Sequence, residues 1–451
     1  MLASIDCAPQ AFSFVDHEHN EMNADTFWRY CAEYQQKIRH IQANNIEATA
    51  IRAALFDTEP GAFCYKLFAL LNQGVEVVLP ANMQPETLSE AQQTCDLVCG
   101  NAPWQAKSHH IDKMAVSGEN EFAQRAIWPS TGQLVFSTSG STGKSKLIIK
   151  SWAALLRELN QLMGQFPHQG ATTFIPTVPH YHIYGLLFRV LLPMQLGATT
   201  YATKAYPEHF LPILAQSQTR RVVVVSSPAF LERLSEDAVL DDYADKLCCF
   251  VSSGGALSEH AVVSLYEHLR TMFYEVYGST ESGGIASRIH GQAFQPLWTP
   301  FDLIKVRAQA NTQRLILDSG YLDDVEFKMD DKVEIYPNGQ FKLLGRIDRT
   351  VKIEEKRVNL SDLERYLCEH DGVDTCRLLV IKRQRPQLAA VVVLNESVGE
   401  RPGFKLSQEL RKHLANKFEL ICVPKKWRYV ETLPVNDQGK VMIANLEGLF
   451  E

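Results

Sequence analysis

Short apolar runs rich in β-branched residues alternate along this chain with segments in which apolar residues recur at helical spacing. Four of these runs predict β-strands, at residues 75–79, 134–137, 173–176 and 221–225. An apolar stripe over residues 152–166 predicts an amphipathic helix. This alternation is typical of an α/β fold in which mostly parallel sheets are covered by helices.

The pattern changes near Gly345. Before it lie hairpin-like segments such as VEIYPNGQFKLL, with a turn at Asn338 and Gly339, and after it comes a shorter, charged α+β stretch. Since 451 residues exceed what one core normally organises, we predict a large N-terminal domain, 1–345, and a small α+β C-terminal domain, 346–451. In the latter, Ser361 and Glu364 have the spacing of a capping box and predict a helix start.

Composition excludes some partners. The formal net charge is -7 and no basic stripe offsets it, which argues against a nucleic-acid binder. Ten scattered cysteines lack a zinc or redox spacing, so we expect reduced thiols and a cytoplasmic protein. We expect neither a signal peptide nor a membrane span, because the best apolar candidate, GLLFRVLLPM, is short and contains Arg189.

The segment LVFSTSGSTGKSKLIIK, residues 134–150, carries the first chemical signal. Its glycines let backbone N–H groups approach an anion, while its hydroxyls and lysines add donors and positive charge. We therefore expect a nucleotide phosphate loop, followed directly by the 152–166 helix with its N-terminal dipole facing the anion. Gly140 and Gly143 would supply the backbone N–H groups, Ser139, Ser141 and Thr142 the hydroxyls, and Lys144 and Lys146 the positive charge.

One alternative is a Walker A loop, G-x-x-x-x-G-K-S/T. Gly143, Lys144 and Ser145 supply its second half, but Thr138 stands where its first glycine belongs. The loop instead resembles that of the ANL superfamily of adenylate-forming enzymes, S/T-S-G-S/T-T-G-x-P-K-G, which implies that Lys146 is the phosphate-binding lysine. Ser145 and Leu147 replace the usual proline and final glycine. A P-loop kinase or NTPase is thus disfavoured.

A second segment, YGSTESGG, matches the Y-G-x-T-E segment of that superfamily. An aromatic face can stack on adenine, and a carboxylate can hold Mg²⁺. The resemblance implies that Tyr277 stacks on adenine, Gly278 lies against the substrate, Thr280 contacts phosphate and Glu281 binds Mg²⁺. It also implies nucleotide contacts by Ser279 and Glu275, and an adenine and acyl lining formed by Ser253, Gly254, Gly255 and Ala256.

VPHYHIYGLLF, residues 178–188, resembles the P-x-x-H-x-x-G segment of the same superfamily. The resemblance implies that His182 is a steric and hydrogen-bonding gate near the acyl carboxylate, not a general base. The HIY triplet is similar to that of hydroxycinnamate ligases, which would place Tyr184 in the acyl pocket and favour an aromatic acid.

The C-terminal third carries the remaining resemblance. Counting from Gly345 places Asp331 at the aspartate that binds the ribose hydroxyls, although Met329 and Asp330 replace the usual Thr-Gly. The resemblance further implies that Arg346 reaches ribose or phosphate, that Asp348 is the hinge of the mobile C-terminal domain, and that Lys440 is the catalytic lysine. Glu355 replaces a glycine next to the pantetheine tunnel, which weakens the expectation for CoA.

The resemblance therefore implies an ATP- and Mg²⁺-dependent acid–thiol ligase. Thr142, Glu281 and Lys440 would neutralise charge while a small carboxylic acid becomes an acyl adenylate and pyrophosphate leaves. The thiol of CoA, or of the phosphopantetheine of an acyl carrier protein as in aryl polyene or polyketide clusters, would then accept the acyl group. A non-catalytic nucleotide-binding scaffold remains an alternative, favoured by the departures at Ser145, Leu147, Met329 and Glu355.

Overall fold

The computed structural model forms two compact units, Met1–Gln295 with Phe301–Ile304 and Ser319–Asp323, and Pro296–Pro300 with Lys305–Asp318 and Asp324–Glu451. The predicted boundary at residue 345, as the place where a mobile domain turns, stays a prediction. The residues described are 11–16, 18, 20–44, 51–104, 109–113, 128–139, 145–166, 173–201, 207–216, 221–235, 241–322, 326–347, 349–353, 356–381, 387–395, 404–418, 420–436 and 441–450.

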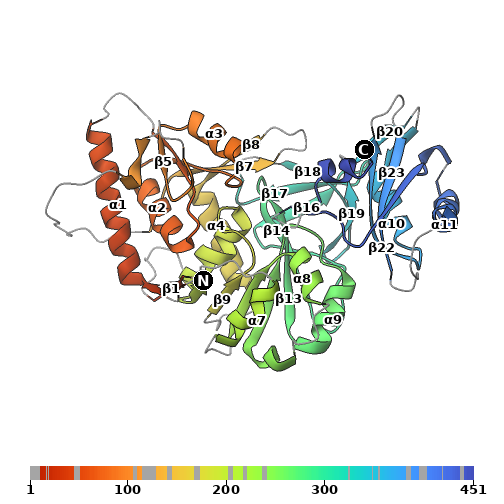
Figure 1. The fold of residues 1–451 in the computed structure, drawn as a ribbon, viewed down its shortest axis with the longest axis horizontal. Helices are drawn as coiled ribbons and strands as arrows, with labels where there is room; N and C mark the ends of the chain where they lie inside the picture. The colour runs from red at the N-terminus through yellow and green to blue at the C-terminus, as the bar shows by residue number, and fades with distance from the viewer. Residues whose placement is uncertain are drawn as a thin grey trace. The chain divides into compact units, whose positions relative to one another are not determined.

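The first unit contains a six-stranded sheet in the order β6-β5-β3-β4-β7-β8. Its neighbours pair in parallel except β7 and β8, which form an antiparallel hairpin. Helices α1 and α2 pack against each other beside this sheet (Figure 1). The elements are α1 (Ala24–Asn44), β3 (Arg52–Leu55), α2 (Pro60–Asn72), β4 (Glu76–Leu79), α3 (Pro85–Gln93), β5 (Leu97–Cys99), β6 (His109–His110), β7 (Gln133–Ser139) and β8 (Ser145–Ser151).

A second sheet of this unit runs in the order β14-β13-β12-β11-β9-β10-β1-β2. Its central strands are parallel. The strands are β1 (Ser13–Val15), β2 (Glu21–Asn23), β9 (Thr173–Pro176), β10 (Thr199–Tyr201), β11 (Val222–Ser226), β12 (Leu247–Ser252), β13 (Met272–Ser279) and β14 (Gly283–His290). The helices are α4 (Trp152–Gln165), α5 (Ile183–Gly185), the π-helical turn η2 (Leu186–Leu191), α6 (Leu192–Gln195), α7 (Pro207–Gln216), α8 (Pro228–Leu234) and α9 (Glu259–Leu269).

Burial explains why the apolar runs form strands. All five residues of β11, VVVVS, are buried, as expected for a central parallel strand covered on both faces. The four predicted strands are confirmed as β4, β7, β9 and β11. The α/β fold with parallel-rich sheets is confirmed as well.

The prediction that α4 directly follows the phosphate loop is wrong. Strand β8 intervenes and runs back along β7, so that Ser139 pairs with Ser145 at the loop end and Gln133 with Ser151 at the far end. Helix α4 begins at Trp152 with Ser151 as its N-cap, whose side chain accepts a hydrogen bond from the Ala154 N–H. Its N-terminus therefore lies at the opposite end of the hairpin from the loop.

The second unit is built from smaller sheets and helices. The predicted turn joins β18 to β19, where Gly339 has φ +83°. The helix expected at Ser361 exists as α10, but the capping-box prediction is wrong, since Asn359 caps it by accepting from Ser361 N and Asp362 N. The elements include β16 (Ile304–Ala308), β17 (Arg314–Ser319), β18 (Phe327–Ile335), β19 (Phe341–Arg346), β20 (Thr350–Ile353), β21 (Lys356–Asn359), α10 (Leu360–Leu367), β22 (Val373–Ile381), β23 (Gln387–Leu394), α11 (Phe404–Ala415), β24 (Lys426–Val430) and α12 (Ile443–Gly448).

Among the described residues of the whole chain, no helix combines the length and the apolar character needed to cross a bilayer.

Candidate functional site

The predicted site segments of the first unit follow parallel strands of one sheet. Strands β9, β11, β12 and β13 are consecutive neighbours, so their carboxyl ends meet at the same edge. The gate segment 178–185 follows β9, the segment 253–257 follows β12, and 277–281 forms the end of β13 and the turn after it. Open α/β sheets bind ligands at this edge.

An ion pair connects this edge to the hairpin that carries the phosphate loop. Lys146 Nζ of β8 lies 2.8 Å from Glu281 Oε1 in the turn between β13 and β14. Burial alone would raise the pKa of Glu281, but the hydrogen bond and charge of Lys146 hold it below its ordinary value. The predicted phosphate lysine and the predicted metal ligand thus lie together, and the carboxylate is ionised at neutral pH.

The centre of the phosphate loop, with Gly140, Ser141, Thr142 and Gly143, lies outside the described residues. Their roles stay predictions. The strands that carry the loop are described, and the register pair Ser139 and Ser145 fixes where it begins and ends.

The turn after β13 has a close backbone approach. A Cβ at Gly278 would lie 2.3 Å from the carbonyl oxygen of Gly283, so a glycine is required there for β14 to approach. Ser279 and Ser282 close the turn, since Ser279 N donates to Ser282 Oγ and Ser282 N donates to Ser279 Oγ. The side chains of Tyr277 and Thr280 are half-buried on either side.

The carboxylate of Glu275 accepts the hydrogen bonds of a buried network. Its Oε2 accepts from Arg288 Nε at 2.7 Å and from His290 Nε2 at 2.9 Å, and its Oε1 accepts from Leu257 N at 3.0 Å. Burial would raise the pKa of Glu275, but the hydrogen bond from His290 and the charge of Arg288 keep it below its ordinary value. The carboxylate therefore anchors the 253–257 segment, and a direct adenine contact stays a prediction.

The anchored segment presents an exposed backbone. Gly254, Gly255 and Ala256 are exposed, and Gly254 has φ +87°, a conformation that favours glycine. Ser253 is half-buried, and its Oγ donates to the Val276 carbonyl, which ties the segment to β13. The segment is thus held at both ends and open in the middle.

The gate residues have different surroundings. His182 is half-buried at the N-cap position of α5, where its carbonyl accepts from Leu186 N. The Tyr184 hydroxyl is 2.9 Å from both the Ser226 and the Val251 carbonyl oxygens, and burial raises its pKa well above the ordinary value. The hydroxyl of Tyr184 is therefore used inside the fold, so its predicted substrate contact would come from the ring.

In the second unit, Asp331 and Arg346 are register partners on β18 and β19. Arg346 Nη1 lies 3.9 Å from Asp331 Oδ2, so the structure brings the two predicted ribose ligands together. Asp348, Glu355 and Lys440 lie outside the described residues, and their roles stay predictions.

One residue beside the site was missed by the sequence analysis. Glu158 of α4 is buried, and its Oε1 accepts from Gly284 N at 2.6 Å, which fixes the strand that follows Glu281. Burial raises its pKa. A carboxylate on the apolar stripe of a predicted helix, between Leu155 and Leu162, was the available signal.

Comparison with known proteins identifies the family of this chain. The profile of the family described as AMP-binding enzyme matches residues 45–320, so the chain belongs to that family. It is accordingly a member of the ANL superfamily of adenylate-forming enzymes, as the resemblance implied. An AMP-forming acid–thiol ligase is the class of enzyme that the similarities support.

Three similar proteins illustrate the relationship. The 4-coumarate–CoA ligase of Halorhodospira halophila is 27% identical over 318 residues, which cover 69% of this chain and 75% of that protein. The D-alanine–D-alanyl carrier protein ligase of Bacillus cereus (strain AH187) is 23% identical over 369 residues, 72% of each chain. The fold of ATP-bound MatB from Rhodopseudomonas palustris is similar, with a TM-score of 0.75 at 16% identity over 98% of this chain and 96% of that one.

Proposed function

We propose that the protein uses ATP to convert a small carboxylic acid into an acyl adenylate, with release of pyrophosphate, and then transfers the acyl group to a thiol. The observation that carries the proposal is the 2.8 Å ion pair between Lys146 and Glu281. The pair brings together a cation next to the predicted phosphate loop and a carboxylate next to the Tyr277–Thr280 segment, which supports the proposal.

The chemistry needs charge neutralisation. A carboxylate anion must attack the α-phosphate of a polyanion, so cations and N–H donors have to surround the phosphates as the bonds change. Lys146 and the loop hydroxyls of Ser139, Ser141 and Thr142 would bind the phosphates, and Lys440 would balance charge at the α-phosphate. No side-chain nucleophile is required.

The residues present fit a Mg²⁺ ion. Glu281 is half-buried and ionised, and a carboxylate oxygen is a hard ligand of the kind that Mg²⁺ takes together with nucleotide oxygens and water. When bound, the ion would neutralise phosphate charge. If Lys146 bound a phosphate instead of Glu281, the Glu281 Oε1 atom would become available to the ion.

The adenine and ribose of the nucleotide would contact the other predicted site residues. Tyr277 would stack on adenine, with Gly278, Ser279 and Thr280 along the phosphates. Gly254, Gly255 and Ala256 would line the base, and Glu275 would hold that lining in place. Asp331 and Arg346 would bind ribose.

We favour an aromatic acid. The gate segment carries four rings, on His180, Tyr181, His182 and Tyr184. Tyr181 and His182 are in edge contact at 4.7 Å, and Tyr184 packs against Phe188 at 5.3 Å. Flat aromatic substrates pack well on such faces. The relative named 4-coumarate–CoA ligase supports this choice. His182 would be the gate, and Ser253 and Gly278 would lie beside the acyl group.

The thiol would be CoA or the phosphopantetheine of an acyl carrier protein, such as one serving an aryl polyene or polyketide cluster. The relative named as a carrier protein ligase supports the second route. A rotation of residues 346–451 about Asp348 would remove Lys440 before thiol attack. A cytoplasmic site for the reaction agrees with the nine free cysteines found among the described residues.

The test is acid-dependent exchange of labelled pyrophosphate into ATP, run with hydroxybenzoates, hydroxycinnamates and medium-chain fatty acids. A ligase gives exchange with one class of acid. A kinase or a nucleotide-binding scaffold gives none, and that result would overturn the proposal. Thioester formation with CoA and with a holo carrier protein then separates the two thiols.

A further inference from the structure

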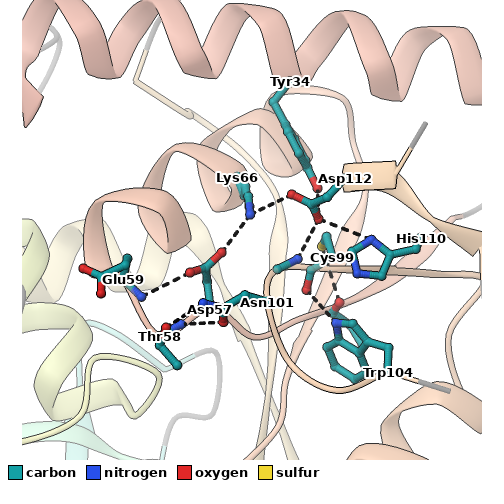
Figure 2. Close-up of polar contacts among 12 residues, drawn as sticks. Tyr34, Asp57, Thr58, Glu59, Lys66, Cys99, Asn101, Trp104, His110 and Asp112 are labelled. Carbon is teal, nitrogen blue, oxygen red and sulfur yellow. Dashed lines mark hydrogen bonds and ion pairs between the residues drawn. The ribbon is translucent and has the colours of Figure 1, made fainter. Parts of the chain in front are cut away.

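Two carboxylates bracket the ammonium group of Lys66 inside the first unit (Figure 2). Lys66 Nζ lies 2.7 Å from Asp57 Oδ2 and 2.7 Å from Asp112 Oδ1, and the side chain of Lys66 is only 8% exposed. Burial alone would lower the pKa of Lys66, but the two carboxylates raise it above its ordinary value. Replacing a buried ion pair with apolar residues of similar size often leaves a protein equally stable or more stable. A contribution to stability alone therefore does not account for this ion pair.

The two ends of this network hold different parts of the fold. At one end, Asp112 Oδ2 accepts from Gly100 N at 2.8 Å and from the Tyr34 hydroxyl at 3.2 Å, which joins α1 to the chain after β5. His110 Nδ1 lies 3.6 Å from the same oxygen. None of these contacts touches the gate segment.

At the other end, Asp57 fixes the turn between β3 and α2. Its Oδ1 accepts from Glu59 N at 3.1 Å, directly before the first residue of α2 (Figure 2). The carbonyl oxygen of Asp57 accepts from His180 Nε2 at 2.8 Å, although His180 lies 123 residues further along the chain. The carboxylate of Asp57 therefore sets the position of a carbonyl that binds the gate segment.

His180 is built into the fold as a neutral donor. It is buried, its ring packs edge-on against Phe63 at 4.8 Å, and burial lowers its pKa well below the ordinary value. Because a carbonyl oxygen only accepts, the hydrogen must lie on Nε2. His180 precedes His182 by two residues, so its hydrogen bond to the Asp57 carbonyl anchors the chain next to the gate residue.

The gate segment is tightly constrained around this bond. Arg189 Nη1 donates to the Val178 carbonyl at 2.8 Å. A Cβ at Gly185 would lie 1.9 Å from the Pro179 carbonyl oxygen, so the two ends of the segment are in close backbone contact. A segment closed in this way moves as a unit when one of its anchors moves.

We propose that Asp57, held by Lys66, is a positioning residue that sets the affinity of the gate segment 178–185 for the carboxylic acid. The effect passes through the Asp57 carbonyl and His180, neither of which is required to touch the substrate. This inference rests on the proposed function, since it takes the gate segment to face the acid. Nucleotide affinity depends on other segments and is not affected.

The experiment compares Asp57→Asn with Asp112→Asn in the 451-residue chain. Each variant removes one carboxylate from the same lysine, and an amide offers one acceptor oxygen where the carboxylate had two. Asp57→Asn loosens the turn that holds His180, whereas Asp112→Asn leaves in place the contacts of the Asp57 carboxylate with Glu59 N and Lys66. We expect Asp57→Asn to raise the KM for the acid about five- to tenfold with the KM for ATP unchanged, and Asp112→Asn to leave both unchanged.

A third variant keeps the charged network intact. His180→Phe retains the ring packing on Phe63 and lacks the Nε2 donor. We expect it to raise the KM for the acid as Asp57→Asn does, and the double variant Asp57→Asn/His180→Phe to add nothing further. An equal rise in Asp112→Asn, or additive effects in the double variant, would overturn the proposal.

Hydrogen–deuterium exchange of the peptide spanning residues 178–190 gives a readout without any substrate. Asp57→Asn and His180→Phe should speed its exchange, and Asp112→Asn should not. The two proposals therefore fail in different ways. If the wild type showed no acid-dependent exchange of pyrophosphate into ATP, the ligase function would be refuted. If the peptide were equally protected from hydrogen exchange in Asp57→Asn and the wild type, the positioning role would be refuted.

Discussion

Replacing Glu275 with Gln tests how the nucleotide lining is held. The carboxylate is fully buried and accepts three hydrogen bonds, from Arg288, His290 and Leu257 N. Arg288 is itself only 8% exposed, so the substitution removes a negative charge that pairs with a buried guanidinium. Removing one partner of a buried ion pair costs about 3–5 kcal/mol in the free energy of unfolding. Gln retains one acceptor, so we expect a loss near the lower limit, about 3 kcal/mol.

The pH dependence of this loss has a defined sign. The pKa of Glu275 in the folded protein lies below its ordinary value of 4.5. Its contribution to stability is therefore complete above that value and disappears as the pH falls through the lower pKa of the folded state. The difference in stability between the wild type and Glu275→Gln should be largest at neutral pH and shrink below pH 4.5.

Urea unfolding of both proteins at several pH values measures this difference, with Glu326→Gln as the control. Glu326 pairs with Arg307, but both side chains are about half exposed, so its replacement should cost less than about 1 kcal/mol. The KM for ATP in Glu275→Gln should rise, because the one acceptor oxygen of Gln cannot bind both Leu257 N and Arg288 as the two carboxylate oxygens do. A loss below 1 kcal/mol at neutral pH, or one that grows on acidification, would refute this reasoning.

Three further predictions concern the edge of the sheet and the second unit. Lys146→Met should change the free energy of unfolding by less than about 1 kcal/mol, because the pair is partly exposed, yet slow pyrophosphate exchange by about 10²-fold; an unchanged exchange rate would contradict the phosphate role. Gly278→Ala should cost about 1–3 kcal/mol in thermal or urea unfolding, since its Cβ meets the Gly283 carbonyl, and a variant as stable as the wild type would contradict that contact. Lys440→Ala should abolish exchange but spare thioester formation from a supplied acyl adenylate, whereas equal loss of both activities would contradict the rotation.

The sequence predicted the central strands well because their apolar runs are buried on both faces. Residues 173–176 were predicted as a strand and form β9 with the same bounds. Strand β8 was missed because lysines flank its short apolar centre and residues 147 and 149 point outward, which resembles a loop more than a buried strand. The helix cap at Asn359 was missed because Ser361 offered a matching motif two residues later.

The site was predictable where its residues are adjacent in the chain. The Tyr277–Glu281 segment could be recognised because one short run carries its aromatic, glycine, hydroxyl and carboxylate groups. The pairing of Lys146 with Glu281, by contrast, joins residues 135 positions apart, and the bond from His180 to the Asp57 carbonyl joins residues 123 apart. Each of these contacts joins a segment of the six-stranded sheet to a segment of the other sheet, and no local pattern encodes how two sheets meet.

Exchange of labelled pyrophosphate into ATP, measured with and without a carboxylic acid, tests the central claim most directly. The account predicts exchange that requires both the acid and Mg²⁺ and that is lost in Glu281→Gln. Exchange that proceeds equally without any acid, or no exchange with any acid while the protein binds ATP, would contradict it.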